Sequence, residues 1–322
     1  MIRPILTSIL AICATAFAAD WQTDFATAQA KAKKENKHLL VEFTGSDWCK
    51  ACIIQKKNVL SKQEFTNPAE QHFVLVELDF PNKVIPADVR RKNEWVRDLY
   101  GIRSFPTILF MTPDGLPYGR TSGAKTSSDA VPIAVSEMEG ALQTHARYQS
   151  LLDQAVRLSG QEKTKKLLEA YNTVPEVFRP HYTDLKEAIA KSDPGNLSGQ
   201  ALTLAREARQ TREQLELRTI SGSDKTPEEK SAAFEAFAAK DVLPDSRVDA
   251  CELQAKALFS IATDDATYDR SLAAHKKALD LLPQDSERAK KLAQSIKEME
   301  MLRTQYIELN KKFAKADNAK NK

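Results

Sequence analysis

The sequence is poor in the side chains that build metal centres. Its 322 residues include four cysteines and five histidines. A structural zinc site needs four ligands, commonly supplied as two Cys or His pairs at short spacing. One such pair is present, Cys49 and Cys52, and the histidines are scattered: His38, His72, His145, His181 and His275. We therefore expect no metal site.

An excess of charge of one sign is also missing. The chain has 47 basic and 44 acidic residues, a formal net charge of +3, and the two signs are interspersed. Nucleic-acid-binding proteins usually concentrate Lys and Arg in a stripe or patch. We therefore expect no nucleic-acid partner.

Long apolar runs are confined to the N-terminus, so no later segment reaches the roughly 20 residues that a membrane-spanning helix needs. Arg3 precedes a mostly apolar run at residues 5–18, which ends in the small-x-small pattern Ala-Phe-Ala. This pattern is typical of a cleaved secretory signal. We expect a signal peptide at residues 1–18 and a secreted or periplasmic mature protein. Cys13 weakly suggests a lipoprotein signal, but the bulky Ile12 before it fits that cleavage poorly, so no lipid anchor is expected.

The length suggests two domains, and the first, at residues 19–140, alternates strand and helix signals. Apolar runs of strand length predict buried strands, and two of them flank a Thr-Pro-Asp-Gly turn as a hairpin. Strands are expected at residues 38–44, 73–78, 107–111 and 117–121. Helices are expected at residues 24–36, 49–60, 88–100 and 128–140. Ser61 and Glu64 have the spacing of a capping box that opens a short helical turn.

Strand signals cease in the second domain, residues 141–322. Helical periods between Gly and Pro residues predict six to eight helices packed as hairpins. The segment YDRSLAAHKKALDLLP at residues 268–283 resembles the second helix of a tetratricopeptide repeat. No second copy follows at the expected period of about 34 residues, so a repeat array and an irregular helical bundle are both open. Cys251 lies among apolar residues at helical spacing, which predicts a buried, inert thiol.

The stretch SDWCKAC at residues 46–52 holds the cysteine pair. A structural disulfide that closes so small a ring would stabilise little, because the chain entropy removed grows with loop length. At the first turn of a helix, unpaired N–H groups and the positive dipole end favour a thiolate at Cys49. Cys52, one turn later, can attack a mixed disulfide formed at Cys49. The pattern therefore favours redox exchange. Lys50 and Asp47 act on the thiol pKa in opposite directions, so the direction of the net pKa shift is open.

The segment VEFTGSDWCKAC, followed downstream by YGIRSFPTILF and TPDG, resembles the thioredoxin family. Within it the sequence is similar to exported thioredoxin-like domains, including the C-terminal domain of the periplasmic thiol:disulfide interchange transporter. The resemblance covers about residues 21–140. It implies an α/β thioredoxin fold, with a mixed central sheet flanked by helices, followed here by an all-α domain.

The resemblance also implies roles for individual residues. Cys49 would be the attacking thiol, Cys52 the resolving thiol and Trp48 the aromatic flank of the pair. Pro106 matches the family's cis-proline, which would expose the backbone of Phe105 to a substrate strand. Thiol–disulfide exchange needs no dissociable cofactor, and none is expected.

Glu42 resembles the buried acid that handles the proton of the resolving thiol. Its spacing to Cys49 is one residue longer than the family's, so Glu42 is either that acid or an ordinary strand residue. The dipeptide Lys50-Ala51 also departs from the Gly-Pro of thioredoxin, so thioredoxin's redox potential cannot be assumed.

These features predict an exported thiol–disulfide oxidoreductase that reduces protein disulfides, with the helical domain positioning a client or partner. A scaffold protein that acts through the helical domain is the alternative from another class. A disulfide oxidase or isomerase shares the motif and differs in redox potential. The client, the membrane or soluble electron partner and the oligomeric state are open.

Overall fold

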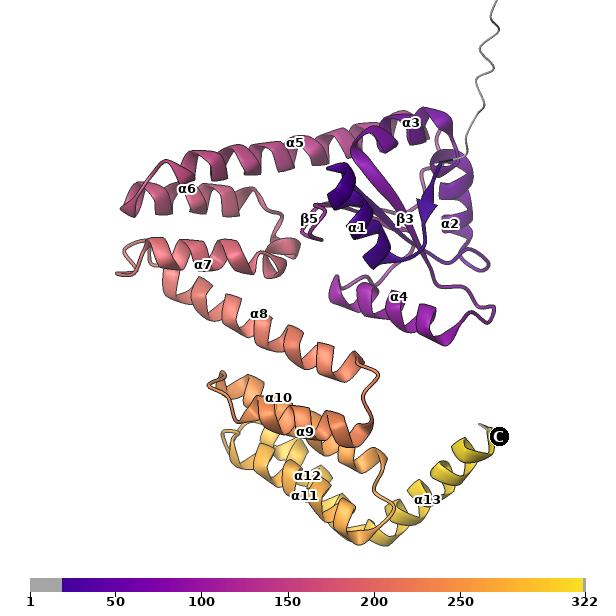
Figure 1. The fold of residues 1–322 in the computed structure, drawn as a ribbon, viewed down its shortest axis with the longest axis vertical. Coiled ribbons are helices and arrows are strands. Elements are labelled where there is room, and N and C mark those ends of the chain that lie inside the picture. Colours follow the sequence, from indigo (N-terminus) through magenta and orange to yellow (C-terminus); the bar gives the residue numbers. More distant parts are fainter. Residues whose placement is uncertain (1–18, 321–322) are drawn as a thin grey trace, which may run out of the picture. The chain divides into compact units, whose positions relative to one another are not determined.

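The structure is a computed structural model that describes residues 19–320. The predicted signal peptide and Cys13 lie outside the described residues. The chain divides into two compact units, the first ending at Ala146 and the second beginning at Arg147 (Figure 1). Along the described chain, no helix is both long and apolar enough to cross a membrane.

A five-stranded mixed sheet forms the centre of the first unit. Its strands are β1 (Trp21–Gln22), β2 (His38–Thr44), β3 (Phe73–Asp79), β4 (Thr107–Met111) and β5 (Pro117–Ser122). Their order is β1-β3-β2-β4-β5; β2 is parallel to β3 and antiparallel to β4, and β4 and β5 form a hairpin. The four predicted strands are confirmed. β1 has two residues, too few to give a sequence signal.

Helices cover both faces of this sheet, which is why six of the seven residues of β2 are buried. On one face, side chains from four neighbouring strands, β3, β2, β4 and β5, form a core with the helices η1 (Lys56–Leu60), α3 (Gln63–His72) and α5 (Ala130–Val156). Leu40, Leu75 and Phe110 lie side by side in register within this core. Alternate residues of β2 point to the other face. There α1 (Phe25–Glu35) contacts β2 and β3 through a buried stripe that contains Phe25, Ala28 and Ala32.

The predicted helices of this unit are present, but two details of the prediction are wrong. The first is the capping box. The N-cap of α3 is Lys62 and makes no side-chain capping bond. The hydroxyl of Ser61 donates instead to the backbone carbonyl of Lys57, 3.3 Å away, because the preceding π-helical turn leaves that oxygen available. α3 is also a full helix of 10 residues rather than a short turn.

The second wrong detail is the end of α5. The sequence predicts that this helix closes near residue 140, whereas it continues to Val156 across the division between the units. Residues 141–156 contain no Gly or Pro and are rich in Ala, Leu and Gln, so no residue breaks the helix.

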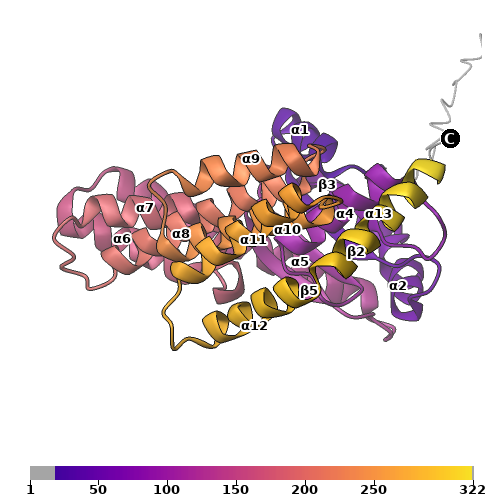
Figure 2. The same cartoon turned by 90° about the horizontal axis from the view of Figure 1, so that it is seen from below.

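The second unit is helical throughout its described residues, as predicted. Eight α-helices follow α5: α6 (Gly160–Thr173), α7 (Thr183–Ser192), α8 (Ala201–Gly222), α9 (Pro227–Ala238), α10 (Pro244–Ser260), α11 (Asp265–Asp280), α12 (Glu287–Met301) and α13 (Arg303–Lys320). A 3₁₀ helix, η2 (Glu176–His181), precedes α7. Successive helices from α6 to α13 contact one another (Figure 2). The relation to tetratricopeptide repeats stays a prediction.

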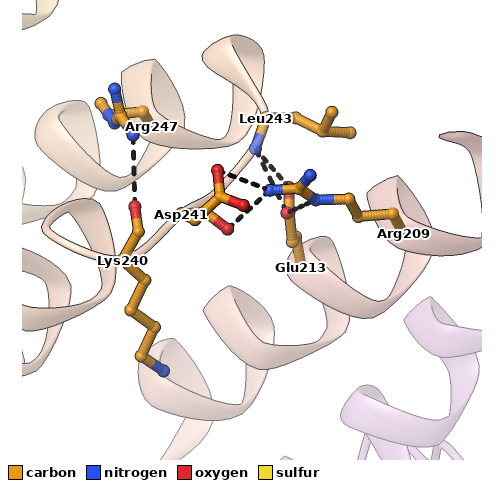
Figure 3. A network of polar contacts seen from close by, with 6 residues as sticks. All are labelled: Arg209, Glu213, Lys240, Asp241, Leu243 and Arg247. Carbon is orange, nitrogen blue, oxygen red and sulfur yellow. Dashed lines mark hydrogen bonds and ion pairs between the residues drawn. The ribbon is translucent and has the colours of Figure 1, made fainter.

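Two kinds of contact hold these helices together. Tyr268 of α11 is fully buried, and its hydroxyl donates to the carbonyl of Met299 in α12 at 2.7 Å. A polar network joins α8 to the turn between α9 and α10 (Figure 3). In it, the carboxylate of Glu213 accepts from Nε of Arg209 at 2.9 Å and from the backbone N–H of Leu243 at 3.1 Å. The backbone N–H of Leu243 thereby gains a partner from α8.

Candidate functional site

The cysteine pair lies where β2 passes through a short turn into α2 (Lys50–Gln55). Cys49 is the N-cap of α2, and its sulfur accepts a hydrogen bond from the backbone N–H of Cys52 at 3.2 Å. The two residues form a disulfide with their Cα atoms 5.2 Å apart. Cys49 is 7% exposed and Cys52 1%, so a partner arriving from solvent reaches Cys49 first. The predicted position of the pair at a helix N-terminus is confirmed.

Trp48, the residue before Cys49, contacts Phe105, which precedes Pro106. Trp48 is 45% exposed, and its ring meets that of Phe105 edge to face, with centroids 5.9 Å apart. The Phe105–Pro106 peptide bond is cis, as the resemblance implies. Gly45 lies under the indole: a Cβ there would be 2.5 Å from Cε2 of Trp48, so the turn needs glycine at this position. Two segments more than fifty residues apart in sequence thus meet at one surface.

Glu42 is fully buried in the centre of β2. Its register partners are Glu77 on β3 and Ile108 on β4. Ile108 belongs to the same core as η1, so Glu42 points toward the helical layer that follows Cys52. Neither carboxylate oxygen has a hydrogen-bond partner. The sequence left open whether Glu42 is an ordinary strand residue; a carboxyl group buried without a partner is not ordinary.

Burial controls the charge of Glu42. Removal from water raises the pKa of this carboxyl group to about 8, and the negative charge of Glu77 adds to the rise. The positive charge of Lys56 opposes it. Lys56 lies in η1, one helical turn after Cys52, and forms an ion pair with Glu77. The carboxyl group of Glu42 therefore has a pKa close to that of a thiol.

Sequence reasoning missed Lys56 and Glu77 as members of this site. The spacing of Lys56 from Cys52 puts both on one helix face, which is a signal available in the sequence. Glu77 gave no signal, because its position beside Glu42 depends on the register between β2 and β3. Elsewhere in the described chain, no group of three His, Cys, Asp or Glu residues is placed to hold a metal ion.

Cys251, the remaining described cysteine, lies on α10 and is fully buried, as predicted. Burial raises the pKa of its thiol, which disfavours the reactive thiolate.

Known proteins resemble the part of the chain that carries the pair. Residues 25–134 match the family model of the thioredoxin-like domain. The disulfide bond reductase DsbH of Chlamydia pneumoniae is 35% identical over 101 residues, which are 31% of this chain and 60% of that protein. The thioredoxin-related protein DsbJ of the same organism is 29% identical over 93 residues, which are 29% of this chain and 27% of that protein.

A solved structure of a DsbH oxidoreductase is 30% identical to this chain. The comparison covers 44% of this chain and 94% of that one, with a TM-score of 0.37. The chain therefore spans 60% of the length of the first curated relative and 27% of the second. The residues that match the family model lie in the first unit.

Proposed function

Because the chain belongs to the thioredoxin-like family through residues 25–134, we propose that it is an exported thiol–disulfide oxidoreductase that reduces protein disulfides. The observation that carries this proposal is the pair itself. Cys49 caps a helix at the surface, and Cys52 lies one turn deeper, above the layer into which Glu42 points. Export is inferred from the sequence of residues 1–18.

In the proposed reaction, the Cys49 thiolate attacks one sulfur of a client disulfide. A Cys49–client bond forms, the client's S–S bond breaks, and one client sulfur leaves as a thiolate that takes up a proton. Cys52 then loses its proton to the carboxylate of Glu42 and attacks the sulfur of Cys49. The Cys49–Cys52 disulfide forms, the Cys49–client bond breaks, and the second client sulfur leaves as a thiolate that takes up a proton. Two electrons pass from the pair to the client, and a second dithiol protein must return them.

Glu42 suits the proton transfer in the second step. General acid–base catalysis is most effective when donor and acceptor have similar pKa values. The pKa of Glu42 is about 8, and that of an ordinary thiol is about 8.5. The proton of Cys52 can therefore move in either direction at little cost in free energy.

The client segment is proposed to bind along the edge formed by Trp48, Phe105 and Pro106. The peptide bond before Pro106 is cis, and the resemblance implies that such a bond exposes the backbone of Phe105 to a client strand. An extended client strand can pair with such an edge through main-chain hydrogen bonds, while its side chains occupy neighbouring pockets. The exposed indole of Trp48 would cover one side of the client disulfide.

Reduction is proposed over oxidation because the first curated relative carries the name of a disulfide bond reductase. An oxidase or isomerase would use the same residues at a less negative potential. The potential of the pair therefore separates these activities.

The helical unit is proposed to select or position the client. It makes up over half of the chain, and its buried thiol, Cys251, is unsuited to exchange. Packed helical hairpins commonly bind a partner segment in a groove. The size of this unit also favours the second candidate function, a scaffold in which the helices hold partners and redox activity is incidental.

Removing the helical unit tests its role. A chain that ends after α5, at Val156, should keep the core contacts of Ala134, Met138 and Ala141 and should still reduce a small disulfide such as oxidised glutathione. It should lose most of its rate of reduction of exported protein clients. These clients are first identified by trapping them as mixed disulfides on the full chain that carries Cys52→Ser. Equal capture of the same clients by the short and the full chain would show that the helices do not select them.

The same experiment decides between enzyme and scaffold. A full chain carrying both Cys49→Ser and Cys52→Ser should lose the biological role if the protein is an oxidoreductase. Retention of that role by the double variant, combined with its loss in the shortened chain, would establish the scaffold function instead.

A further inference from the structure

The turn before Cys49 is bound to a loop from another part of the sheet. Ser46 donates from its backbone N–H and its hydroxyl to the carboxylate of Asp79, at 2.9 and 2.6 Å. The carboxylate of Asp47 accepts hydrogen bonds from the backbone N–H groups of Asn82 and Lys83, at 2.9 and 3.0 Å. These bonds link the turn to the last residue of β3 and to the segment that follows it.

Trp48 completes this set of contacts, because its indole N–H donates to the carbonyl of Phe80 at 2.8 Å. Three consecutive residues, Ser46, Asp47 and Trp48, are therefore all bonded to residues 79–83. Asp47 is solvent-exposed. The hydrogen bonds that its carboxylate accepts from two backbone N–H groups lower its pKa, so Asp47 is negatively charged at neutral pH. The loop has no helix or strand of its own between β3 and α4 (Ala87–Leu99), so Phe80 is held by these contacts together with the bond from its backbone N–H to the carbonyl of Thr44, at 2.9 Å.

Phe80 extends the aromatic surface beside the cysteine pair. Its ring centroid lies 5.2 Å from that of Phe105, which in turn contacts Trp48. The guanidinium of Arg97, on α4, lies 5.6 Å from the centroid of Phe80. All three rings are partly or fully exposed. Trp48, Phe105, Phe80 and Arg97 form one continuous row, which we name the aromatic row.

The same loop also exposes an aliphatic side chain. Val84 is 96% exposed and follows directly after Lys83, whose N–H is bound by Asp47. Apolar side chains gathered at one exposed surface usually mark a contact with another molecule. The aromatic row presents ring faces and edges together with a guanidinium. Such a surface is most attractive to another aromatic ring, through edge-to-face contact and cation–π attraction.

We propose that the aromatic row is a docking subsite for an aromatic side chain next to the target disulfide in an extended client, and that Asp47 is the residue that positions it. This inference rests on the proposed function and names the class of client that the same site takes. A small client side chain such as that of Ala would gain neither contact at that position.

Two peptides test the proposal with the full chain. Each carries one intrachain disulfide, and they differ only in a Phe or an Ala near one cysteine. Wild-type protein should reduce the Phe peptide with a KM about 2- to 10-fold lower, the range expected for one aromatic contact. Phe80→Ala should raise the KM for the Phe peptide to that for the Ala peptide, and Phe80→Tyr should restore the difference. Phe313→Ala, which removes an exposed ring from the helical unit, is the matched control and should keep the preference.

Asp47→Ala tests positioning, because it removes no ring and deletes only the bonds from Asp47 to the loop. In this variant the KM for the Ala peptide divided by the KM for the Phe peptide should fall toward one. Asp47→Asn keeps one acceptor oxygen, so this ratio should fall less. A wild-type protein that does not distinguish the peptides would overturn the proposal. So would a fall in kcat that is equal for both peptides in Phe80→Ala, because Phe80 would then support the cysteine pair rather than the client.

Binding without turnover separates this inference from the proposed function. Protein with Cys49→Ser and Cys52→Ser, titrated calorimetrically with peptides whose cysteines are replaced by serine, should still bind the Phe version 2- to 10-fold more tightly, the same aromatic contact being present. If that preference is found but no peptide disulfide is reduced by wild-type protein, the docking subsite stands and the proposed reductase function fails. If reduction occurs without any preference in either assay, the function stands and the subsite fails.

Discussion

Replacing Cys49 with Ser is expected to abolish reduction of protein disulfides, whereas Cys52→Ser is expected to leave the protein covalently bound to its client. Cys49 supplies the nucleophile, so a hydroxyl in its place cannot form the mixed disulfide. Without Cys52, the mixed disulfide forms and has no resolving thiol. The first outcome is measured as turnover in an assay that follows reduction of a protein disulfide. The second is measured as the mass of the trapped complex. The expected loss for Cys49→Ser is at least about 10³-fold, since no other described thiol is exposed to replace it.

Cys251→Ser is the matched control for this pair of variants. Its thiol is fully buried on α10, so its loss should alter neither turnover nor trapping. Full turnover in Cys49→Ser would contradict the mechanism. A mixed disulfide that forms through Cys52 rather than Cys49 would contradict the order of attack inferred from their exposure.

The second large effect concerns Glu42 and the dependence of stability on pH. Its pKa in the folded protein is about 8, against an ordinary value of 4.5. Between these values the folded state holds a proton that the unfolded state has released. The contribution of Glu42 to stability is therefore expected to fall as pH rises from about 4.5 to about 8, by about 3 kcal/mol at pH 7. Denaturant unfolding of the oxidised wild type and of Glu42→Gln across this range isolates that contribution, because the buried His145 and His181, whose pKa values are lowered to about 4, add a slope of the opposite sign in both proteins.

Glu42→Gln should remove the contribution of Glu42 to the slope, because the amide does not ionise. It should also slow release of the mixed disulfide by about 10²-fold, the lower end for loss of a general base. The stability change is read from the oxidised protein and the rate change from single-turnover release. An unchanged release rate between pH 6 and 9 would make Glu42 a structural residue, whatever the slope of stability.

Removing the charge of Lys56 or of Glu77 should shift the pKa of the Glu42 carboxyl group in opposite directions, and the two variants serve as controls for each other. Lys56→Met removes a positive charge and should raise the pKa of Glu42, whereas Glu77→Gln removes a negative charge and should lower it. The carboxyl resonance of Glu42 reports both shifts directly. Shifts of the same sign in the two variants would show that the ion pair does not govern the charge of Glu42.

Local patterns in the sequence were enough to predict most of the first unit. The apolar runs that became β2 and β3 are bounded by polar segments, and the hairpin turn carries its own residue signature. The end of α5 was predicted wrongly because the change from one unit to the next is not marked by a helix-breaking residue. The Ser61–Glu64 pattern failed for the opposite reason, since a local motif was overridden by the helical turn before it.

The site shows the same division between local and long-range information. Cys49 and its helix follow from one short segment, and the place of Trp48 and Pro106 follows from the resemblance. The ion pair of Lys56 with Glu77 depends on strand register, and the contacts of Asp47 depend on a loop more than thirty residues away. Such contacts are created by the fold, so no pattern within one segment reveals them.

The redox potential of the Cys49–Cys52 pair tests the central claim most directly. The protein is equilibrated with glutathione and dithiothreitol buffers, and the reduced and oxidised forms are counted by mass after alkylation. A reductase should titrate reversibly by two electrons between roughly −270 and −200 mV, the interval of thioredoxin and the glutaredoxins. A pair still oxidised below about −300 mV would be a structural disulfide. A potential near −120 mV, as in a strong oxidant, would contradict the reducing direction.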